Sequence, residues 1–385
     1  MRVAIVCDLA EERWPSMDLV GDMLLAELRG THAGAIAADL VRPVMRRRLS
    51  RVRNDVGPRF TADRFLNRFW DYPRHLARQR TREAFDVFHV VDHSYGQLVH
   101  QLPAARTVVT CHDLDTFRCL LEPARDRRSP AFRAMTRRIL GGLRRAAVVT
   151  CDSAAVRDEI LAHGLLPAER LTVVPLGIHP TCSPGPDAAA DAEARRLLGP
   201  AGGDRVELLH VGSTVPRKRL DVLLGLFAAV RRARPSARLV RVGGAFTPEQ
   251  AALARRLGVD EAVTALPFLP RQVLAAVYRR ATLVLQPSSA EGFGLPVVEA
   301  LACGTPVVAS DLAVLREVGG AAATYRPVAD VPAWTEAVLA LLTERRDDPA
   351  AWQARRAAGA ARAAAFSWSE YARRMVEVYA EVLAA

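Results

Sequence analysis

Two carboxylates eight positions apart mark the stretch of this chain with the clearest chemical potential. The stretch reads Glu-Gly-Phe-Gly-Leu-Pro-Val-Val-Glu, runs from Glu291 to Glu299 and follows a short apolar run. Its two glycines let the backbone approach a ligand, and Pro296 suits the first position of a helix. The free amides and the positive end of such a helix attract phosphate groups or sugar hydroxyls. We therefore expect a phosphate or sugar site here.

The two carboxylates can reach different parts of one ligand. Glu291 follows the carboxyl end of an expected strand, where open α/β sheets bind their ligands, and Glu299 lies about one turn into the helix. The alternative is that Glu291 is a surface acid and that Glu299 is favoured only by the helix dipole.

The only lysine of the chain lies in a second glycine-containing stretch. Of the 53 basic residues, Lys218 alone is not arginine, and it ends the sequence Val-Gly-Ser-Thr-Val-Pro-Arg-Lys. A compact ammonium and a guanidinium bind phosphates differently. Gly212 permits a tight turn after a strand, and Arg217 with Lys218 can neutralise a pyrophosphate, which is otherwise the work of a magnesium ion. The alternative is a loop with solvated charges.

A third candidate lies in the first half of the chain, at Thr-Cys-His-Asp. His112 and Asp113 follow the end of an expected strand, and a histidine there can hydrogen-bond a sugar or a developing charge. We count both as candidate catalytic residues. A lone histidine is more often structural, which is the alternative, and His93 has the same placement with weaker support.

Short β-branched runs alternate with helical segments along the chain, as in parallel sheets covered by helices. We predict strands at Val3–Cys7, Val87–Val91, Thr107–Cys111, Ala147–Cys151, Leu171–Val174, Val206–Val211, Arg238–Val242, Val263–Leu266, Leu283–Gln286 and Pro306–Ser310. We predict helices at Met17–Arg29, Pro130–Arg145, Ser153–His163, Arg219–Arg234, Pro248–Leu257, Arg271–Arg280 and Pro296–Cys303. The expected fold is α/β, with two Rossmann-like domains facing a cleft.

A length of 385 residues favours two domains. The stretch 181–204 is rich in Pro, Gly, Ala and Asp and is the expected linker. We place a first domain at 1–180, a second domain at 181–365 and a helix at 366–385 that returns to the first domain. That helix has five apolar residues on one face: Trp368, Tyr371, Met375, Val378 and Val382.

The net charge of +11 is concentrated in one segment, since 13 arginines and three acids fall between Arg42 and Arg82. Part of this segment, Ala62–Gln79, is compatible with a basic amphipathic helix. It is either a solvated face, a surface for an anionic membrane or lipid-diphosphate acceptor, or a site for another acidic partner.

Several classes of protein are disfavoured. No apolar run approaches the about 20 residues of a membrane span, and the N-terminus lacks the apolar core of a signal peptide. The six cysteines show no metal-binding spacing, so we expect reduced thiols and no metal. A cytoplasmic protein is expected, with association to the inner face of the plasma membrane left open.

These motifs resemble the Glu-x7-Glu signature of the retaining glycosyltransferases of family 4, also called group 1, which have the GT-B fold. Val-Val-Pro-Leu-Gly-Ile at 173–178 and Cys-Gly-Thr-Pro-Val-Val-Ala-Ser-Asp at 303–311 also fall where that family has them. The similarity covers the second domain nearly end to end and the first more loosely.

The resemblance implies a role for each matched residue. Glu291 would contact the donor sugar, Glu299 the ribose, and Arg217 with Lys218 the diphosphate, beside Gly212 and Ser213. The amides of Phe293, Gly294 and Leu295 would meet sugar and phosphate oxygens, and His112 would lie near the sugar and acceptor. The implied reaction moves a hexose from a UDP- or GDP-sugar to an acceptor hydroxyl with retention and without metal. The acceptor would be a sugar or lipid-linked glycan of a cell-envelope polysaccharide or glycolipid.

Two departures from the family pattern concern the site. Many members have arginine where this chain has Ser213, so Arg217 is expected to supply that charge. Many also have two glycines after the first strand, where this chain has Glu11 and Glu12. This bulkier loop makes the acceptor contacts of the family uncertain here.

Other functions fit less of the sequence. An epimerase or phosphorylase on the same fold conflicts with the spacing from Glu291 to Glu299. A basic nucleic-acid-binding protein would explain the arginines and leave the other motifs unexplained, so no nucleic-acid partner is expected. A dehydrogenase is disfavoured because no Gly-x-Gly-x-x-Gly follows the first strand.

Overall fold

A computed structural model describes residues 1–51, 57–82, 84–200 and 206–385 of the chain. These residues form two compact units, of which unit 1 comprises 1–177 and 368–385 and unit 2 comprises 178–367. The sequence analysis placed the two boundaries between the domains after residues 180 and 365. Both units are α/β with a parallel sheet, as predicted, and each sheet has six strands where the sequence predicted five.

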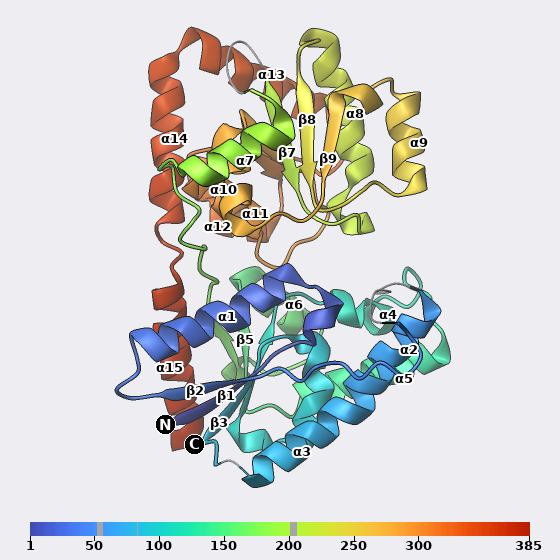
Figure 1. The fold of residues 1–385 in the computed structure, drawn as a ribbon, viewed down its shortest axis with the longest axis vertical. Helices are drawn as coiled ribbons and strands as arrows, with labels where there is room; N and C mark the ends of the chain where they lie inside the picture. The colour runs from blue at the N-terminus through green and yellow to red at the C-terminus, as the bar shows by residue number, and fades with distance from the viewer. Residues whose placement is uncertain (52–56, 83, 201–205) are drawn as a thin grey trace. The chain divides into compact units, whose positions relative to one another are not determined.

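The sheet of unit 1 has the order β2-β1-β3-β4-β5-β6, and all its neighbouring strands are parallel. Its strands are β1 (Arg2–Val6), β2 (Ala37–Val41), β3 (Val87–Val90), β4 (Thr107–Cys111), β5 (Val148–Cys151) and β6 (Leu171–Val173). The helices α1 (Pro15–Gly30) and α15 (Trp368–Ala384) pack together on one face (Figure 1). On the other face α3 (Tyr72–Arg82), the 3-10 segment η3 (His93–Gln101) and α5 (Pro130–Leu143) pack together.

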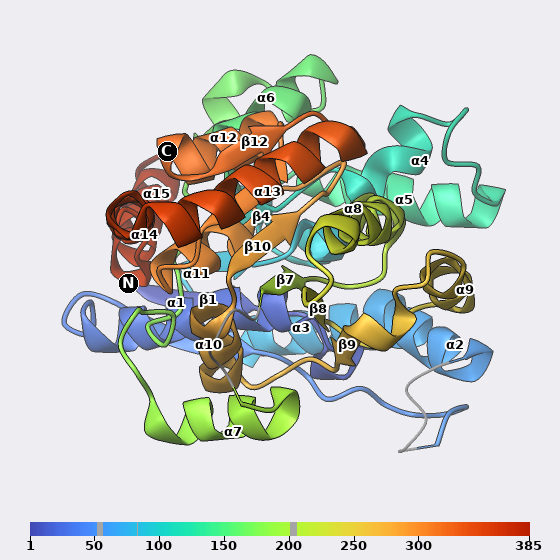
Figure 2. The ribbon, with the colours of Figure 1, turned by 90° about the horizontal axis from the view of Figure 1, so that it is seen from above.

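The sheet of unit 2 has the order β12-β11-β10-β7-β8-β9 and is also parallel. Its strands are β7 (Glu207–Val211), β8 (Arg238–Val242), β9 (Val263–Leu266), β10 (Leu283–Gln286), β11 (Val307–Ser310) and β12 (Thr324–Arg326). The helices of unit 2 form two groups (Figure 1, Figure 2). One group comprises α8 (Leu220–Ala233), α9 (Pro248–Arg256) and α13 (Val331–Asp347). The other comprises α7 (Ala188–Leu198), α10 (Arg271–Arg280), α11 (Leu295–Ala302), α12 (Ala313–Gly319) and α14 (Pro349–Ala363).

Apolar runs and capping residues explain why these elements form. Strands buried on both faces read as continuous apolar runs, such as the fully buried β4 and β10. Ser153 caps α6 (Ala154–Ala162) by accepting a hydrogen bond from the Val156 amide. Thr247 and Gln250 form a capping box at the start of α9.

The C-terminal helix confirms the predicted apolar face. All five of its predicted apolar residues are buried in unit 1. The Tyr379 hydroxyl lies 2.7 Å from Nδ1 of the buried His89 on β3. The end of the chain is therefore built into the core of unit 1.

Part of the predicted linker is a helix. Residues 181–204 contain α7, a helix capped by Asp187 and fixed to α10 by a 2.6 Å ion pair between Asp191 and Arg279. Alanine favours helix strongly, and the flanking Pro and Gly residues concealed this short segment. Residues 201–204 of the prediction lie outside the described part of the chain.

Two strands, β2 and β12, were not predicted. Both are edge strands of their sheets, and neither is continuously buried. An edge strand needs no long apolar run, so its pattern in the sequence is weak.

The arginine-rich segment is helical over a longer range than predicted. Its helices are α2 (Pro58–Leu66), a π-helical turn at Asn67–Asp71 and α3. Phe60, Tyr72 and Leu76 are buried in unit 1. Residues 52–56 of the predicted basic segment lie outside the described residues. No helix of the described ranges has both the length and the apolar character of a membrane span.

Candidate functional site

The candidate site of unit 2 lies where the strand order of its sheet reverses. Strands β7 and β10 are neighbours, with later strands added outward on either side. Ligands of open α/β sheets bind beyond the carboxyl ends of the strands at such a switch point. The loop 212–219 follows β7, and the loop 287–294 follows β10. The amide of Ser289 donates a hydrogen bond to the Arg217 carbonyl at 2.8 Å, which joins the two loops.

Glu291 lies at the centre of this switch point and pairs with both predicted cations. Lys218 Nζ donates to its Oε1 at 2.6 Å, and Arg217 donates to its Oε2 at 3.1 Å. Gln286 also donates to Oε1 at 2.6 Å. Burial alone would raise the pKa of Glu291, but the charges of Lys218 and Arg217 and hydrogen bonds from Lys218 and Ser288 lower it to about 2. The carboxylate is therefore ionised and held in place.

Arg241 is a candidate site residue that the sequence interpretation missed. It is fully buried on β8, and its guanidinium donates to the carbonyls of Gly212, Gly243 and Gly244. No carboxylate among the described residues forms an ion pair with it, and burial lowers its pKa to about 10. A charged residue inside an apolar parallel strand was the signal in the sequence.

These groups leave an excess of positive charge at the switch point. Arg217, Lys218 and Arg241 carry three charges, and Glu291 carries one of opposite sign, so two remain. His210 at the end of β7 adds none, because burial and the charges of Lys218 and Arg241 lower its pKa to about 3. The excess matches the charge of a nucleoside diphosphate ester.

The loop after β7 can approach a ligand closely. Gly212 donates its amide to the Val242 carbonyl at 2.9 Å, and Ser213 beside it is half-buried. Gly243 faces this loop with a φ of +131°, and a Cβ atom there would lie 2.0 Å from the Gly212 oxygen. Glycine is therefore needed at position 243. The sequence analysis had named Gly212 as the glycine that permits this tight turn.

The start of α11 presents backbone amides beside Glu291. The first amides of a helix have no partner within it; here the first belongs to Leu295, because Pro296 has no N–H and the Val297 amide donates to the Gly294 carbonyl at 2.9 Å. Gly294 precedes the helix with a φ of +96°, and a Cβ there would lie 2.6 Å from Leu315 Cδ2. Phe293 is buried against Phe366, with ring centroids 5.5 Å apart. Pro296 is the second residue of the helix rather than the first.

Glu299 has a different environment from Glu291. It lies buried on α11 and accepts a 2.9 Å hydrogen bond from the Tyr278 hydroxyl. Burial raises its pKa to about 7, although Tyr278 and Arg271 act in the opposite direction. Glu299 is thus close to half ionised at neutral pH.

His112 in unit 1 already uses both ring nitrogens. Nδ1 lies 2.6 Å from Asp152 Oδ2, and Nε2 lies 2.7 Å from the Val91 carbonyl. Burial would lower the pKa of His112, but Asp152 and Asp92 raise it to about 9. Burial also raises the pKa of Asp152. Because Asp92 adds a second carboxylate near His112, the proton is favoured on the histidine. His112 therefore provides a buried positive charge rather than a free hydrogen-bond donor.

His93 is the histidine with a free ring nitrogen. Its Nδ1 accepts the His112 amide at 3.2 Å, so Nε2 carries a ring proton. Nε2 is buried without a hydrogen-bond partner among the described residues. Asp113 Oδ1 lies 3.6 Å away and also accepts the Asp115 amide. The weaker of the two histidine predictions is the one with an available donor.

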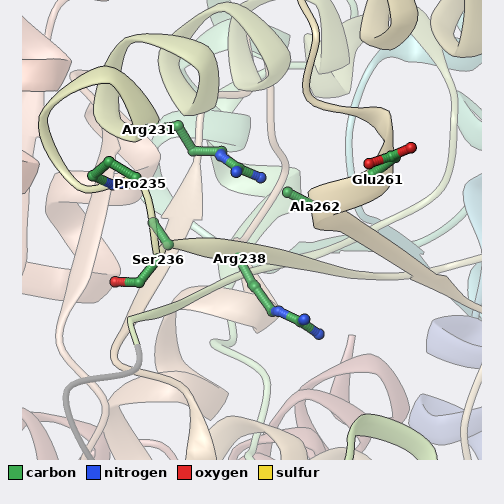
Figure 3. A pocket seen from close by; sticks show the side chains of 7 residues that line it. Arg231, Pro235, Ser236, Arg238, Glu261 and Ala262 are labelled. Carbon is green, nitrogen blue, oxygen red and sulfur yellow. The ribbon is translucent and has the colours of Figure 1, made fainter.

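A surface pocket elsewhere in unit 2 is not part of this site. It lies at the amino end of β8, whereas Lys218 and Glu291 lie beyond the carboxyl ends of β7 and β10. The residues around it come from α8, the loop between α8 and β8, the first residue of β8 and the turn before β9 (Figure 3). None of the predicted site residues lines it. Among the described residues, no group of three or more His, Cys, Asp or Glu side chains is arranged to hold a metal ion.

Comparison with known proteins identifies similar sequences. Residues 199–358 match the family model described as "Glycosyl transferases group 1", and residues 28–181 match "Glycosyltransferase Family 4". The D-inositol 3-phosphate glycosyltransferase of Frankia alni is 33% identical over 319 residues, or 78% of this chain and 75% of that protein. The protein of the same name from Segniliparus rotundus is 38% identical over 227 residues, which are 56% of this chain and 48% of that protein. The chain thus matches about half the length of some of these relatives.

Solved structures show the same fold. Sucrose-phosphate synthase from Thermosynechococcus elongatus has a TM-score of 0.78 at 21% identity, covering 100% of this chain and 99% of that one. Anabaena HepE in complex with UDP-glucose has a TM-score of 0.71 at 17% identity, covering 99% of this chain and 100% of that one. Both are GT-B glycosyltransferases, as the predicted fold class requires.

Proposed function

The chain belongs to glycosyltransferase family 4, the group 1 glycosyl transferases, and on this premise we propose that it transfers a hexose from a UDP- or GDP-sugar to an acceptor hydroxyl with retention of anomeric configuration. The observation that carries the proposal is the pair of unbalanced positive charges at the switch point of unit 2. A nucleoside diphosphate ester carries two negative charges, so it would complete the charge balance that Glu291 leaves open.

The proposed roles follow from the contacts of each residue. Lys218 donates one of its three N–H groups to Glu291, which leaves donors for a phosphate. Arg241 would act without touching the ligand, since its buried charge and its bonds to the Gly212 carbonyl fix the loop. The amides at the start of α11 would bind phosphate or sugar oxygens.

The proposed transfer occurs on one face of the sugar. The acceptor oxygen forms its bond to the anomeric carbon on the face from which the diphosphate oxygen departs. The acceptor proton passes to the departing phosphate oxygen, and the two excess charges stabilise the negative charge that develops there. Preorganised charges of this kind lower the barrier because they need no rearrangement during the reaction.

We also propose that the reaction needs no metal ion, since Arg217, Lys218 and Arg241 stand where a divalent cation would otherwise act. Turnover with UDP-glucose and GDP-mannose should therefore be the same in EDTA as in magnesium. A requirement for magnesium would contradict this part of the proposal.

Product stereochemistry tests retention directly. The enzyme is incubated with an α-linked nucleotide sugar and an acceptor, and the anomeric proton coupling of the new glycoside is measured by NMR. An α-linked product is expected. A β-linked product would overturn the retaining mechanism while leaving the donor site intact.

We further propose that the protein is cytoplasmic and that its segment 42–82 contacts an anionic membrane surface. Five large apolar residues of the segment are exposed, namely Val44, Leu49, Phe65, Leu66 and Trp70. They accompany exposed arginines such as Arg46 and Arg59. Apolar side chains among basic ones suit the boundary of an anionic bilayer. Other arginines of the segment bind carboxylates of unit 1, as Arg48 does with Asp71.

Vesicle sedimentation tests this surface. The wild-type protein should bind phosphatidylglycerol vesicles more strongly than phosphatidylcholine vesicles, and Trp70→Ser with Phe65→Ser should weaken binding. Phe268→Ser is the matched control, because Phe268 is exposed at 56%, close to the 57% of Trp70, and lies in unit 2. Equal loss in both variants, or no loss in either, would contradict the proposal.

A further inference from the structure

Glu299, the glutamate expected to contact the donor ribose, is held by a tyrosine from a neighbouring helix. The hydroxyl of Tyr278 on α10 donates a hydrogen bond to Oε2 of Glu299 on α11 at 2.9 Å. Tyr278 is fully buried. The sequence analysis did not single it out, because a tyrosine in an amphipathic helix is an ordinary core residue. Only the folded chain shows that its hydroxyl reaches the site.

This hydrogen bond leaves the second oxygen of Glu299 open to a ligand. No other side chain among the described residues donates to the carboxylate. Oε1 is nevertheless absent from the buried polar atoms that lack a partner in this part of the chain, so it lies at the surface of unit 2. The protein thus fixes one oxygen and leaves the other free to accept a hydrogen bond from a ligand hydroxyl.

The position of Tyr278 is itself fixed by the backbone around it. Its carbonyl accepts hydrogen bonds from the Thr305 hydroxyl at 2.6 Å and from the Ala281 amide at 3.0 Å. The amide of Thr305 in turn donates to the Ala300 carbonyl on α11 at 2.9 Å. Thr305 therefore ties the end of α10 to α11, so the tyrosine hydroxyl and the carboxylate are held at a set distance.

The other groups near Glu299 cannot replace this hydrogen bond. Arg271 on α10 acts on Glu299 through its charge, and the thiol of Cys182 lies within electrostatic range. On the helices packed against α11, Arg356 of α14 donates to the Gly304 carbonyl and Arg316 of α12 pairs with Asp311. The tyrosine hydroxyl is thus the one directional contact of the carboxylate among the described residues.

The hydroxyl also favours the ionised form of Glu299. Burial raises the pKa of Glu299 to about 7, and the hydrogen bond from Tyr278 opposes this rise more strongly than the charge of Arg271 does. A hydroxyl donates more strongly to a carboxylate than to a neutral acid. Removal of the hydroxyl should therefore shift the pKa of Glu299 to a higher value.

We propose that Tyr278 is a positioning residue for the donor ribose, because its hydroxyl holds Glu299 with Oε1 directed toward a ribose hydroxyl. This proposal rests on the proposed glycosyltransferase function and deepens it, since it adds to the donor site a residue that touches no part of the ligand. Tyr278 acts through Glu299 alone. Its effect should therefore be confined to ligands that carry ribose hydroxyls.

A matched pair of ligands tests this restriction. Binding of UDP-glucose and of its 2′,3′-dideoxyribose analogue is measured by calorimetry in EDTA at pH 8, with the corresponding GDP-mannose pair in parallel. Tyr278→Phe keeps the ring and removes the hydroxyl. It should weaken binding of the hydroxylated ligand about three- to tenfold and that of the analogue less than about twofold. Equal loss for both ligands, or no loss for either, would overturn the proposal.

Tyr379→Phe is the matched control. Tyr379 is also fully buried, and its hydroxyl contacts a buried side chain, His89, but in unit 1. This variant should change the affinity for neither ligand. A loss equal to that in Tyr278→Phe would show a general effect of removing a buried hydroxyl and would contradict the proposal.

The pH profile gives a second measure that a merely structural role would not change. The affinity for UDP-glucose should rise with pH as Glu299 ionises, and in Tyr278→Phe the midpoint of this rise should lie at higher pH than in the wild-type chain. Identical midpoints would contradict the proposal.

The wild-type chain keeps the proposal testable even if Tyr278→Phe fails to fold. Its preference for UDP-glucose over the dideoxy analogue should increase between pH 6 and pH 8. Absence of any preference at either pH would refute this inference while leaving the proposed function intact. Failure of the wild-type chain to bind both UDP-glucose and GDP-mannose would instead refute the proposed function.

Discussion

The two units have sheets built alike, yet the carboxylates at their switch points differ in their state of ionisation. In unit 2 the loops after β7 and β10 bring together Arg217 and Lys218, with Arg241 beneath them and Glu291 between. In unit 1 the loops after β1 and β3 bring together Asp8 and Asp92. The comparison shows that the topology determines where a ligand binds, while a few residues beyond the strands determine its chemistry.

The carboxylates of the two sites respond to these surroundings in opposite ways. The pKa of Glu291 falls to about 2 because Lys218 and Arg217 outweigh its burial. The pKa of Asp8 rises because burial and Asp92 act in the same direction. Glu291 is thus ionised beside its cations, whereas burial and Asp92 favour the protonated form of Asp8.

The largest expected effect comes from removing one positive charge at the switch point of unit 2. Lys218→Gln should reduce turnover by about 10²–10³-fold, because it removes a cation placed at the departing diphosphate. Turnover with a saturating nucleotide sugar is the measurement. Arg219→Gln is the control in the same loop, since Arg219 pairs with Asp221 instead of Glu291. Near-normal turnover in Lys218→Gln would refute the role of this lysine.

A second prediction concerns the buried charge pair of unit 1. The pKa of His112 is raised to about 9, so its protonated form stabilises the fold. This stabilisation is complete below the usual histidine pKa of 6.5 and is lost as the pH rises through about 9. Its loss should amount to about 3 kcal/mol.

Chemical denaturation at pH 6 and at pH 10 measures this effect. The free energy of unfolding should fall with pH more steeply for the wild-type chain than for His112→Gln. Parallel pH profiles for the two proteins would show that His112 is not charged in the folded state.

The smallest expected effect concerns Glu299. Its pKa is raised to about 7, so the fraction of ionised carboxylate, the better acceptor for ribose hydroxyls, increases across neutral pH. Affinity for UDP-glucose should therefore rise a few-fold between pH 6 and 8, and Glu299→Gln should abolish this dependence. UDP-glucose is the suitable probe because its diphosphate does not titrate in this range. Equal pH dependence in both proteins would exclude a ribose contact through the carboxylate.

Ionisation of Glu299, which should raise the affinity for UDP-glucose, should lower the free energy of unfolding. A carboxyl whose pKa is raised in the folded state favours folding at low pH, and this contribution is lost as the pH rises from about 4.5 through about 7. Glu299→Gln should therefore be relatively more stable than the wild-type chain at pH 8 than at pH 4.

Local patterns predicted much of this fold and of the unit 2 site. Strands such as β4 and β10 were predicted with the bounds they have, because continuous apolar runs define buried parallel strands. The predicted cluster of Lys218 and Arg217 follows from the rule that ligands bind at the carboxyl ends of strands. The contact of both with Glu291 spans more than 70 residues, and only the folded chain shows it.

What the sequence could not provide depends on partners distant in the chain. The saturation of His112 by Asp152 and the Val91 carbonyl requires the register of β3, β4 and β5. The isolation of Arg241 from any described carboxylate is likewise a property of the packed sheet. Both facts change the chemistry expected of the site, since one histidine loses its free nitrogen and one arginine gains an uncompensated charge.

Calorimetric titration of UDP in EDTA tests the central claim most directly, namely that the switch point of unit 2 binds a nucleoside diphosphate by its own positive charges. The wild-type chain should bind one UDP without metal, and Lys218→Gln should bind at least about tenfold more weakly. GDP is titrated in parallel, since the guanine nucleotide is the other proposed donor base. Binding of either nucleotide only when magnesium is added, or equal binding by the variant, would contradict the account.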